Sequence, residues 1–125
     1  METKSPRSLP NGPIDCEELL SRCMGRMELM ERMLTSFRDN AESDVDALLD
    51  AIESGDKQEL ARIAHKLKGT SLTVSARSLA DTADRLQEVA VRDAEDSLSD
   101  FACELKREYD SVSSHLTLLL SGGAF

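Results

Sequence analysis

The sequence predicts an all-α protein: an antiparallel, up-down-up-down four-helix bundle preceded by a short N-terminal capping helix. Aromatic residues make up 3% of the 125 residues and tryptophan is absent, so residues that favour strands are scarce. Apolar residues recur every three or four positions over most of the chain, which is the period of an amphipathic helix. The segments with this period are joined by connections of a few residues, and short connections make successive helices antiparallel neighbours.

The first helix is expected to be short and to follow an N-terminal tail. Residues 1–13 hold all three prolines and few apolar side chains, so we interpret them as a mobile tail or linker. Asp15 and Glu18 then have the spacing of a capping box, while Ile14 and Leu19 have that of a hydrophobic staple. These signals predict that order begins at Ile14 and that a helix ends near Cys23 to Gly25, covering one end of the core.

The second helix is expected to run from Arg26 to Gly55 without a break. Ser43 and Asp44 could cap a new helix, but the apolar stripe keeps its phase through them. Gly55 can supply the left-handed residue that closes a helix. The stripe consists of Met27, Met30, Leu34, Phe37, Ala41, Val45, Leu48 and Ile52.

Three more helices complete the expected bundle at residues 14–121. Asp56 with Glu59 forms a second capping box, so the third helix begins at once and should end near Val74. A connection near Arg92 leads to the last helix, after which 122–125 form a C-terminal tail. The three stripes are Leu60, Ile63, Ala64, Leu67 and Val74; Leu79, Ala83, Leu86 and Ala90; and Leu98, Phe101, Leu105, Tyr109, Val112, Leu116 and Leu119.

Composition limits the class of protein. The net charge of −9 argues against nucleic-acid binding, which depends on basic residues that neutralise phosphates. No apolar run approaches the roughly 20 residues of a membrane span, and the first residues lack the apolar core of a signal peptide. The three cysteines lack metal-ligand spacing and fit reduced thiols. We therefore expect a cytoplasmic monomer that binds neither nucleic acid nor membrane.

His65 is the candidate for chemistry, although most lone surface histidines have none. It lies roughly 160° from the centre of the apolar stripe of its helix, so its imidazole should face water. Arg62 and Lys68 lie three positions to either side, and Gly69 lies four positions on. A glycine inside a helix costs about 1 kcal/mol against alanine, so its place beside the imidazole indicates room for a large partner. Residues 56–77 hold five basic and two acidic residues, and 5 − 2 gives a local charge of +3.

Three stretches carry a resemblance to a known family: the run Ala64-His65-Lys66-Leu67-Lys68-Gly69, the preceding Ile52-Glu53-Ser54-Gly55-Asp56, and Leu79 with Leu86-Gln87. They closely resemble the histidine-containing phosphotransfer (HPt) domains of bacterial two-component phosphorelays, and the similarity covers about residues 14–120. The resemblance implies that His65 accepts a phosphoryl group from a receiver-domain aspartate and passes it to another receiver.

The resemblance also implies roles for the neighbours of this imidazole. Lys68, and less directly Lys66 and Arg62, would pair with the phosphoryl oxygens, as cations do with phosphate. Gln87 would orient the imidazole through a hydrogen bond, and Gly69 would leave space for the rim of the receiver. We expect these roles to support a phosphoryl carrier that has no kinase activity of its own, since the chain has no glycine-rich nucleotide loop.

The expected partners are receiver domains of response regulators or of a hybrid histidine kinase. The receiver would hold any magnesium ion, and this chain would bind no cofactor. Four residues near the histidine are weaker candidates, predicted to contact the docked partner: Arg62, Lys66, Leu72 and Gln58. An alternative is an interaction module that binds a receiver or another signalling partner without chemistry, and a third interpretation is the substrate domain of a chemotaxis-type kinase.

Two further residues leave questions for the structure. Family members usually have glycine ten residues after the histidine, where this chain has Ser75. If the turn needs a positive φ, serine is strained there by about 1 kcal/mol; otherwise Ser75 caps the fourth helix, which is the interpretation we favour. The second histidine, His115, lies far from the motif and is expected to be a surface or boundary residue without chemistry.

Overall fold

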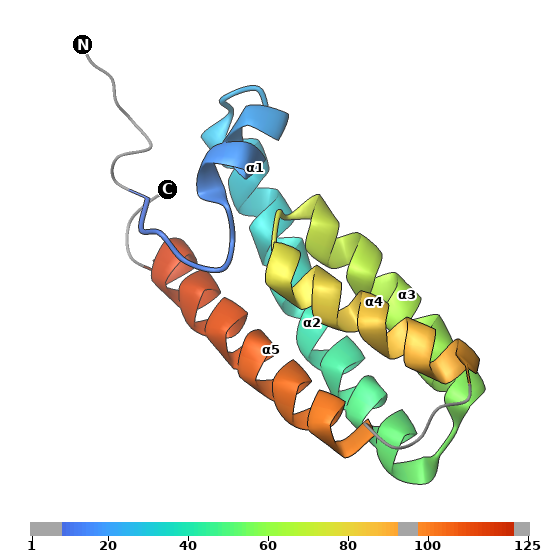
Figure 1. Cartoon of the computed structure of the whole chain (residues 1–125). Coiled ribbons are helices and arrows are strands. Elements are labelled where there is room, and N and C mark those ends of the chain that lie inside the picture. Colours follow the sequence, from blue (N-terminus) through green and yellow to red (C-terminus); the bar gives the residue numbers. More distant parts are fainter. Residues whose placement is uncertain (1–8, 93–97, 122–125) are drawn as a thin grey trace.

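The computed structural model describes residues 9–92 and 98–121 and confirms an all-helical fold (Figure 1). Within these residues there are five helices and no strand: α1 (Cys16–Arg22), α2 (Met27–Ser54), α3 (Lys57–Thr73), α4 (Arg77–Arg92) and α5 (Leu98–Ser121). Helices α2 to α5 run up, down, up and down, as predicted. The expected connection after Arg92 and the expected tail at 122–125 lie outside the described residues.

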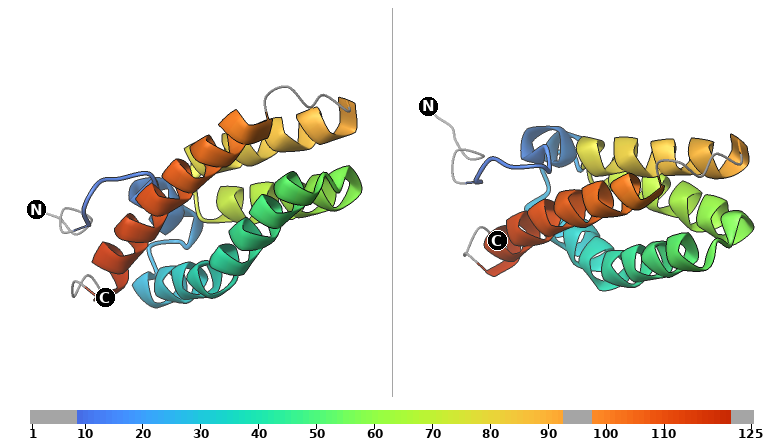
Figure 2. Two further views of the ribbon diagram at one scale, coloured as in Figure 1. Left: turned by 90° about the horizontal axis from the view of Figure 1, so that it is seen from below. Right: turned by 60° about the horizontal axis from the view of Figure 1, so that its bottom comes forward.

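The four long helices pack in a closed square. α3 packs most extensively against α4, α2 contacts α3 and α5, and α4 contacts α5. Figure 2 shows the same arrangement from two further directions, with α1 across one end of the bundle. Each long helix contributes fully buried leucines to one shared core, for example Leu48, Leu67, Leu86 and Leu105. The predicted apolar stripes therefore form the core, although five of their residues are only partly buried: Met27 and Ile52 in α2, and Leu98, Phe101 and Tyr109 in α5.

The helix ends follow the signals in the sequence. The side chain of Asp15 accepts a hydrogen bond from the backbone N–H of Glu18 at 3.0 Å, and Asp56 caps α3 in the same way through Glu59 at 3.1 Å. The reciprocal half of each predicted capping box is replaced, because the backbone N–H of Asp15 donates to the carbonyl of Ser75 and that of Asp56 to the carbonyl of Ala51. Gly55 closes α2 with a φ of 75°. Because φ is positive there, glycine avoids the steric cost that a side chain would bring.

Ser75 does not cap α4, so the favoured interpretation of this residue is wrong. Its φ is 60°, in the left-handed region, whereas an N-cap residue has an extended backbone. Ser75 is buried, and its carbonyl accepts a hydrogen bond from the backbone N–H of Asp15 at 2.9 Å, which joins the α3–α4 turn to the start of α1. The other interpretation therefore holds: the turn needs a positive φ, and the backbone of Ser75 is strained there.

Replacing Ser75 with glycine is expected to stabilise the fold by about 0.5–1 kcal/mol. The left-handed backbone costs a non-glycine residue roughly 1–2 kcal/mol, and the greater freedom of glycine in the unfolded chain offsets part of that gain. Urea unfolding of Ser75→Gly measures the difference. Ser114→Gly, at an exposed position inside α5, is the matched control and should lose stability. A Ser75→Gly protein that is no more stable than the parent contradicts the strain at this turn.

The packed part of the chain begins before Ile14, earlier than expected. Leu9 is buried, and the segment that follows it is fixed by the imidazole of His115, which is 4% exposed. The backbone N–H of Ile14 donates to Nδ1 of His115 at 3.2 Å, so Nε2 carries the proton and donates to the carbonyl of Pro10 at 2.8 Å. The expectation that His115 lies at the surface is therefore wrong, because this residue fastens 9–14 to α5.

Candidate functional site

The side chain of His65 is exposed on α3, on the side of the helix opposite the core. The buried face of the same helix is formed by Leu60, Ile63, Ala64 and Leu67, none more than 3% exposed. This face fixes the rotation of α3 in the bundle. The predicted orientation of the imidazole toward solvent is what the structure shows.

Gln87 on α4 contacts one nitrogen of this imidazole. Nδ1 of His65 lies 3.4 Å from Oε1 and 3.3 Å from Nε2 of the Gln87 amide. The amide oxygen can therefore accept a hydrogen bond from Nδ1–H or, in the other orientation, the amide NH₂ can donate a hydrogen bond to an unprotonated Nδ1. No hydrogen bond joins Nε2 of His65 to a residue in 9–92 or 98–121, and the residue is exposed. In the Nδ1–H tautomer, the lone pair of Nε2 is therefore not engaged by the described part of the chain.

Lys68 lies beside this pair but is held by an acidic residue that we did not predict. Its Nζ lies 3.0 Å from Oδ1 of Asp84 on α4. Because α3 and α4 are antiparallel, Lys68, three residues after His65, lies opposite Asp84, three residues before Gln87. The spacing of Asp84 and Gln87 on one helical face is the sequence signal for this second pair.

The other two basic residues expected near the phosphoryl group point elsewhere. Nζ of Lys66 lies 3.1 Å from Oδ1 of Asp44, an 8% exposed residue on α2, so this lysine extends to the side of α3 away from Gln87. Arg62 pairs with Glu59 on its own helix at 2.7 Å. Four of the basic residues in 56–77 are thus paired with acids, and three of those acids lie outside this window: Glu18, Asp44 and Asp84.

Gly69 is exposed and lies inside the regular part of α3. A Cβ built at this position meets no heavy atom within 4 Å in the described part of the chain. Neighbouring side chains therefore do not require glycine here. The open space at Gly69 is consistent with a partner protein that approaches α3 closely at this position.

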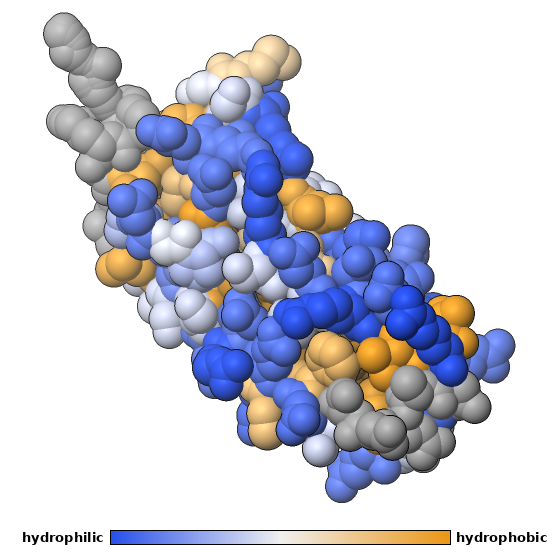
Figure 3. Space-filling view, viewed as in Figure 1, coloured by the Kyte–Doolittle hydropathy of each residue, from blue (hydrophilic) through white to orange (hydrophobic). Residues whose placement is uncertain are grey.

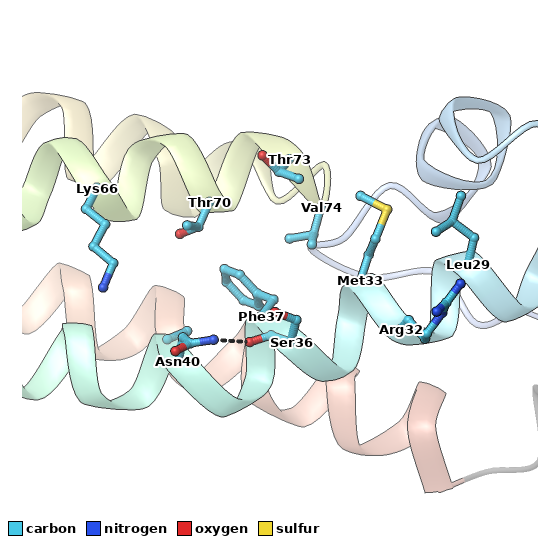
Figure 4. Close-up of a pocket in the computed structure, with 11 residues that line it drawn as sticks. Leu29, Arg32, Met33, Ser36, Phe37, Asn40, Lys66, Thr70, Thr73 and Val74 are labelled. Atoms are coloured by element: carbon cyan, nitrogen blue, oxygen red, sulfur yellow. Dashed lines mark hydrogen bonds between the residues drawn. The ribbon is translucent and has the colours of Figure 1, made fainter.

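A groove of about 680 Å³ lies between α2 and α3 (Figure 4). Its apolar part is formed by Leu29, Met33, Phe37 and Val74, while polar and basic side chains lie along its edges: Arg32, Ser36, Asn40, Lys66, Thr70 and Thr73.

Leu72 is 41% exposed and Gln58 is also exposed, but neither lines this groove. The face drawn in Figure 3 is covered mostly by hydrophilic side chains, with smaller apolar areas between them. The groove between α2 and α3 is a candidate surface for docking a partner protein, and among the predicted docking residues only Lys66 lines it.

No group of three or more His, Cys, Asp or Glu side chains in 9–92 and 98–121 is arranged to hold a metal ion. None of the described helices has the length and apolar character needed to span a membrane. Cys16 and Cys23 are buried and Cys103 is exposed, and all three are free thiols.

The fold and the site together define a histidine phosphotransfer domain, a helical bundle that presents one exposed imidazole. Residues 32–115 match the family model described as the Hpt domain, so the chain belongs to the Hpt family. This membership assigns it a histidine phosphotransfer role in phosphorelays.

One solved structure is similar over most of both chains: the crystal structure of histidine-containing phosphotransfer protein B (HptB) from Pseudomonas aeruginosa PAO1. The identity is 25%, the TM-score is 0.79, and the match covers 87% of this chain and 95% of that one. A comparison with curated proteins found no match. The predicted family is thus confirmed by a sequence model and by a structure.

Proposed function

We propose that this chain is a phosphoryl carrier in which His65 takes a phosphoryl group from the aspartyl phosphate of one receiver domain and gives it to the aspartate of another. The proposal rests on the imidazole of His65: the residue is exposed, and Gln87 contacts Nδ1, which leaves Nε2 as the nitrogen without a partner in the described residues. A neutral imidazole nitrogen held on a rigid helix is a competent nucleophile. The receivers belong to response regulators or to a hybrid histidine kinase.

The proposed reaction uses Nε2 of His65 as the attacking atom. Its lone pair attacks phosphorus in line with the bond to the aspartyl oxygen; that P–O bond breaks, the carboxylate leaves, and a P–Nε2 bond forms. The ring gains positive charge, which Oε1 of Gln87 stabilises by accepting the hydrogen bond from Nδ1–H. In the onward step a second carboxylate attacks phosphorus and the electron pair of the P–N bond returns to Nε2.

We propose that the receiver supplies magnesium for this reaction and that Lys68 supplies the nearest cation from the bundle. Charge spreads over the phosphoryl oxygens during transfer, and a cation stabilises it. Lys68 lies one helical turn from His65 on the same side as Gln87, whereas Lys66 is directed to Asp44 on α2. We therefore assign phosphoryl contact to Lys68 and only partner contact to Lys66 and Arg62.

We propose that the receiver domain docks on the groove between α2 and α3. Its apolar part, with Met33 and Phe37, can bury apolar side chains of a partner, and its edge residue Lys66 is the immediate neighbour of the histidine. We propose that the receiver covers this groove and the exposed Leu72 while its active site lies over the open space at Gly69. Gln58 and Arg62, exposed earlier on α3, extend the same contact.

Transfer from a phosphorylated receiver tests this function. The full chain is incubated with a receiver labelled on its aspartate, and the bundle is separated and treated with acid or base. The carrier predicts label that acid removes and base preserves, as for a phosphoramidate bond. Binding of the receiver without transfer of label, while a control Hpt domain accepts it, identifies the chain as an interaction module instead.

Replacing Gln87 with alanine is expected to slow phosphoryl acceptance about fivefold. A hydrogen bond of this kind contributes roughly 1 kcal/mol, which corresponds to that factor. Initial rates of label transfer measure the change, and Glu88→Ala, the next exposed position on α4, is the matched control. Equal rates for the two variants contradict an orienting role for Gln87.

A further inference from the structure

Four side chains form a compact cluster across α3 and α4: His65, Gln87, Lys68 and Asp84. Lys68 and Asp84 are 3.0 Å apart and are 37% and 44% exposed, so their pair is in contact with solvent and can open. The pair is anchored on the same helices as the His65–Gln87 contact, one turn away. No hydrogen bond or ion pair joins Asp84 to His65 or Gln87 in the described residues.

We propose that Asp84 is a positioning residue that holds Lys68 in the unphosphorylated bundle and competes with the phosphoryl group for it. This inference rests on the proposed function and deepens it. Asp84 then lowers the affinity of His65 for the phosphoryl group, and so sets how readily the bundle gives that group to the next receiver.

The competition follows from charge. A phosphoryl group carries a charge of about −1.5 to −2 near neutral pH and has three acceptor oxygens, whereas the carboxylate of Asp84 carries one negative charge. Once phosphorus is bound to Nε2, Lys68 has two anionic partners within one helical turn. Pairing with the phosphoryl oxygens requires Lys68 to leave Asp84, and the uncompensated carboxylate then faces a second anion. Both effects disfavour the phosphorylated state.

The two other ion pairs near His65 do not share this geometry. Asp44 is buried and holds Lys66 on the α2 side, while Glu59 holds Arg62 within one turn of α3. Of these three ion pairs, the pair of Lys68 and Asp84 is the one that joins the two helices carrying the imidazole and its glutamine. The inference therefore concerns Asp84 and does not extend to every acid in the region.

The test measures the phosphorylation equilibrium of His65 in the full chain. The bundle is phosphorylated with phosphoramidate, whose P–N bond breaks with loss of ammonia as the P–Nε2 bond forms, and then equilibrated with a receiver. Phosphorus NMR reports the fraction on histidine. Asp84→Asn is compared with Asp81→Asn, which removes the same charge from an exposed site one turn earlier on α4.

Asp84→Asn is expected to shift the equilibrium toward the phosphorylated bundle about three- to tenfold, an effect that high salt reduces. Asp81→Asn should change it less than twofold. In a Lys68→Met background the competition for the lysine is absent and only the repulsion between Asp84 and the phosphoryl group remains, so the gain from Asp84→Asn should become smaller, which a merely structural role would not produce. Equal shifts for the two asparagine variants, or an undiminished gain without Lys68, overturn the inference. Absence of any exchange of the phosphoryl group between the parent protein and the receiver would instead refute the proposed function.

Discussion

His65→Gln is expected to abolish phosphoryl acceptance while the bundle stays folded. The variant has no nucleophilic ring nitrogen at this position, so we expect no label above background. Because the side chain is exposed and glutamine favours helices, its replacement opens no cavity and should change stability by no more than about 0.5 kcal/mol. Label transfer and thermal unfolding of the same preparation measure the two effects.

His115→Gln is the matched control for this prediction because it removes the other histidine of the chain. The imidazole of His115 is buried and makes hydrogen bonds on both nitrogens, so its loss should cost about 1–3 kcal/mol. Transfer should continue at temperatures where this variant is folded. Label on His65→Gln, or its absence from folded His115→Gln, contradicts the assignment of the acceptor.

Gly69→Gln is expected to slow transfer from a receiver at least tenfold, since a long side chain would occupy the open space beside the imidazole. The substitution should raise stability by about 0.5–1 kcal/mol, because glycine is unfavourable inside a helix and a Cβ here meets nothing in the described chain. Phosphorylation by phosphoramidate, a small donor, should stay near the parental rate. Rapid-quench transfer with both donors separates the two effects.

Gly69→Ala controls for helix propensity in this experiment. It gives a similar gain in stability with only one added carbon, so its transfer rate from the receiver should fall much less than that of Gly69→Gln. If Gly69→Gln accepts the phosphoryl group from a receiver as fast as the parent, the glycine does not serve partner approach.

Sequence reasoning succeeded where the signals are local. The stripe from Met30 to Leu48 keeps one helical phase, and α2 is unbroken. Asp15 and Asp56 start helices at the predicted positions because a cap is decided within four residues. The exposure of His65 also follows from its angle to the stripe, which one helix determines alone.

The errors concern contacts between segments that are distant in sequence. The sequence pattern of Ser75 is that of a cap, but its carbonyl pairs with the N–H of Asp15 and its backbone is left-handed. His115 is fixed by backbone groups about one hundred positions away, which no periodicity reveals.

The same limit applies to the site. Lys68 was expected to be available to the phosphoryl group, yet Asp84, sixteen positions later, holds it in the resting bundle. Gln87 could be proposed only from the family resemblance, because its distance to the imidazole depends on how α3 packs against α4. A count of charges within residues 56–77 gives +3 for the same reason, because most of the acids that pair with these basic residues lie on other helices.

The most direct test of the account is to locate the phosphoryl group after transfer from a receiver. The protein labelled with nitrogen-15 in its histidines is phosphorylated by the receiver and studied by nitrogen and phosphorus NMR. We predict one phosphoryl group on Nε2 of His65, since Gln87 contacts Nδ1. A phosphoryl group on Nδ1, on another side chain, or on no residue of a folded protein contradicts the central claim.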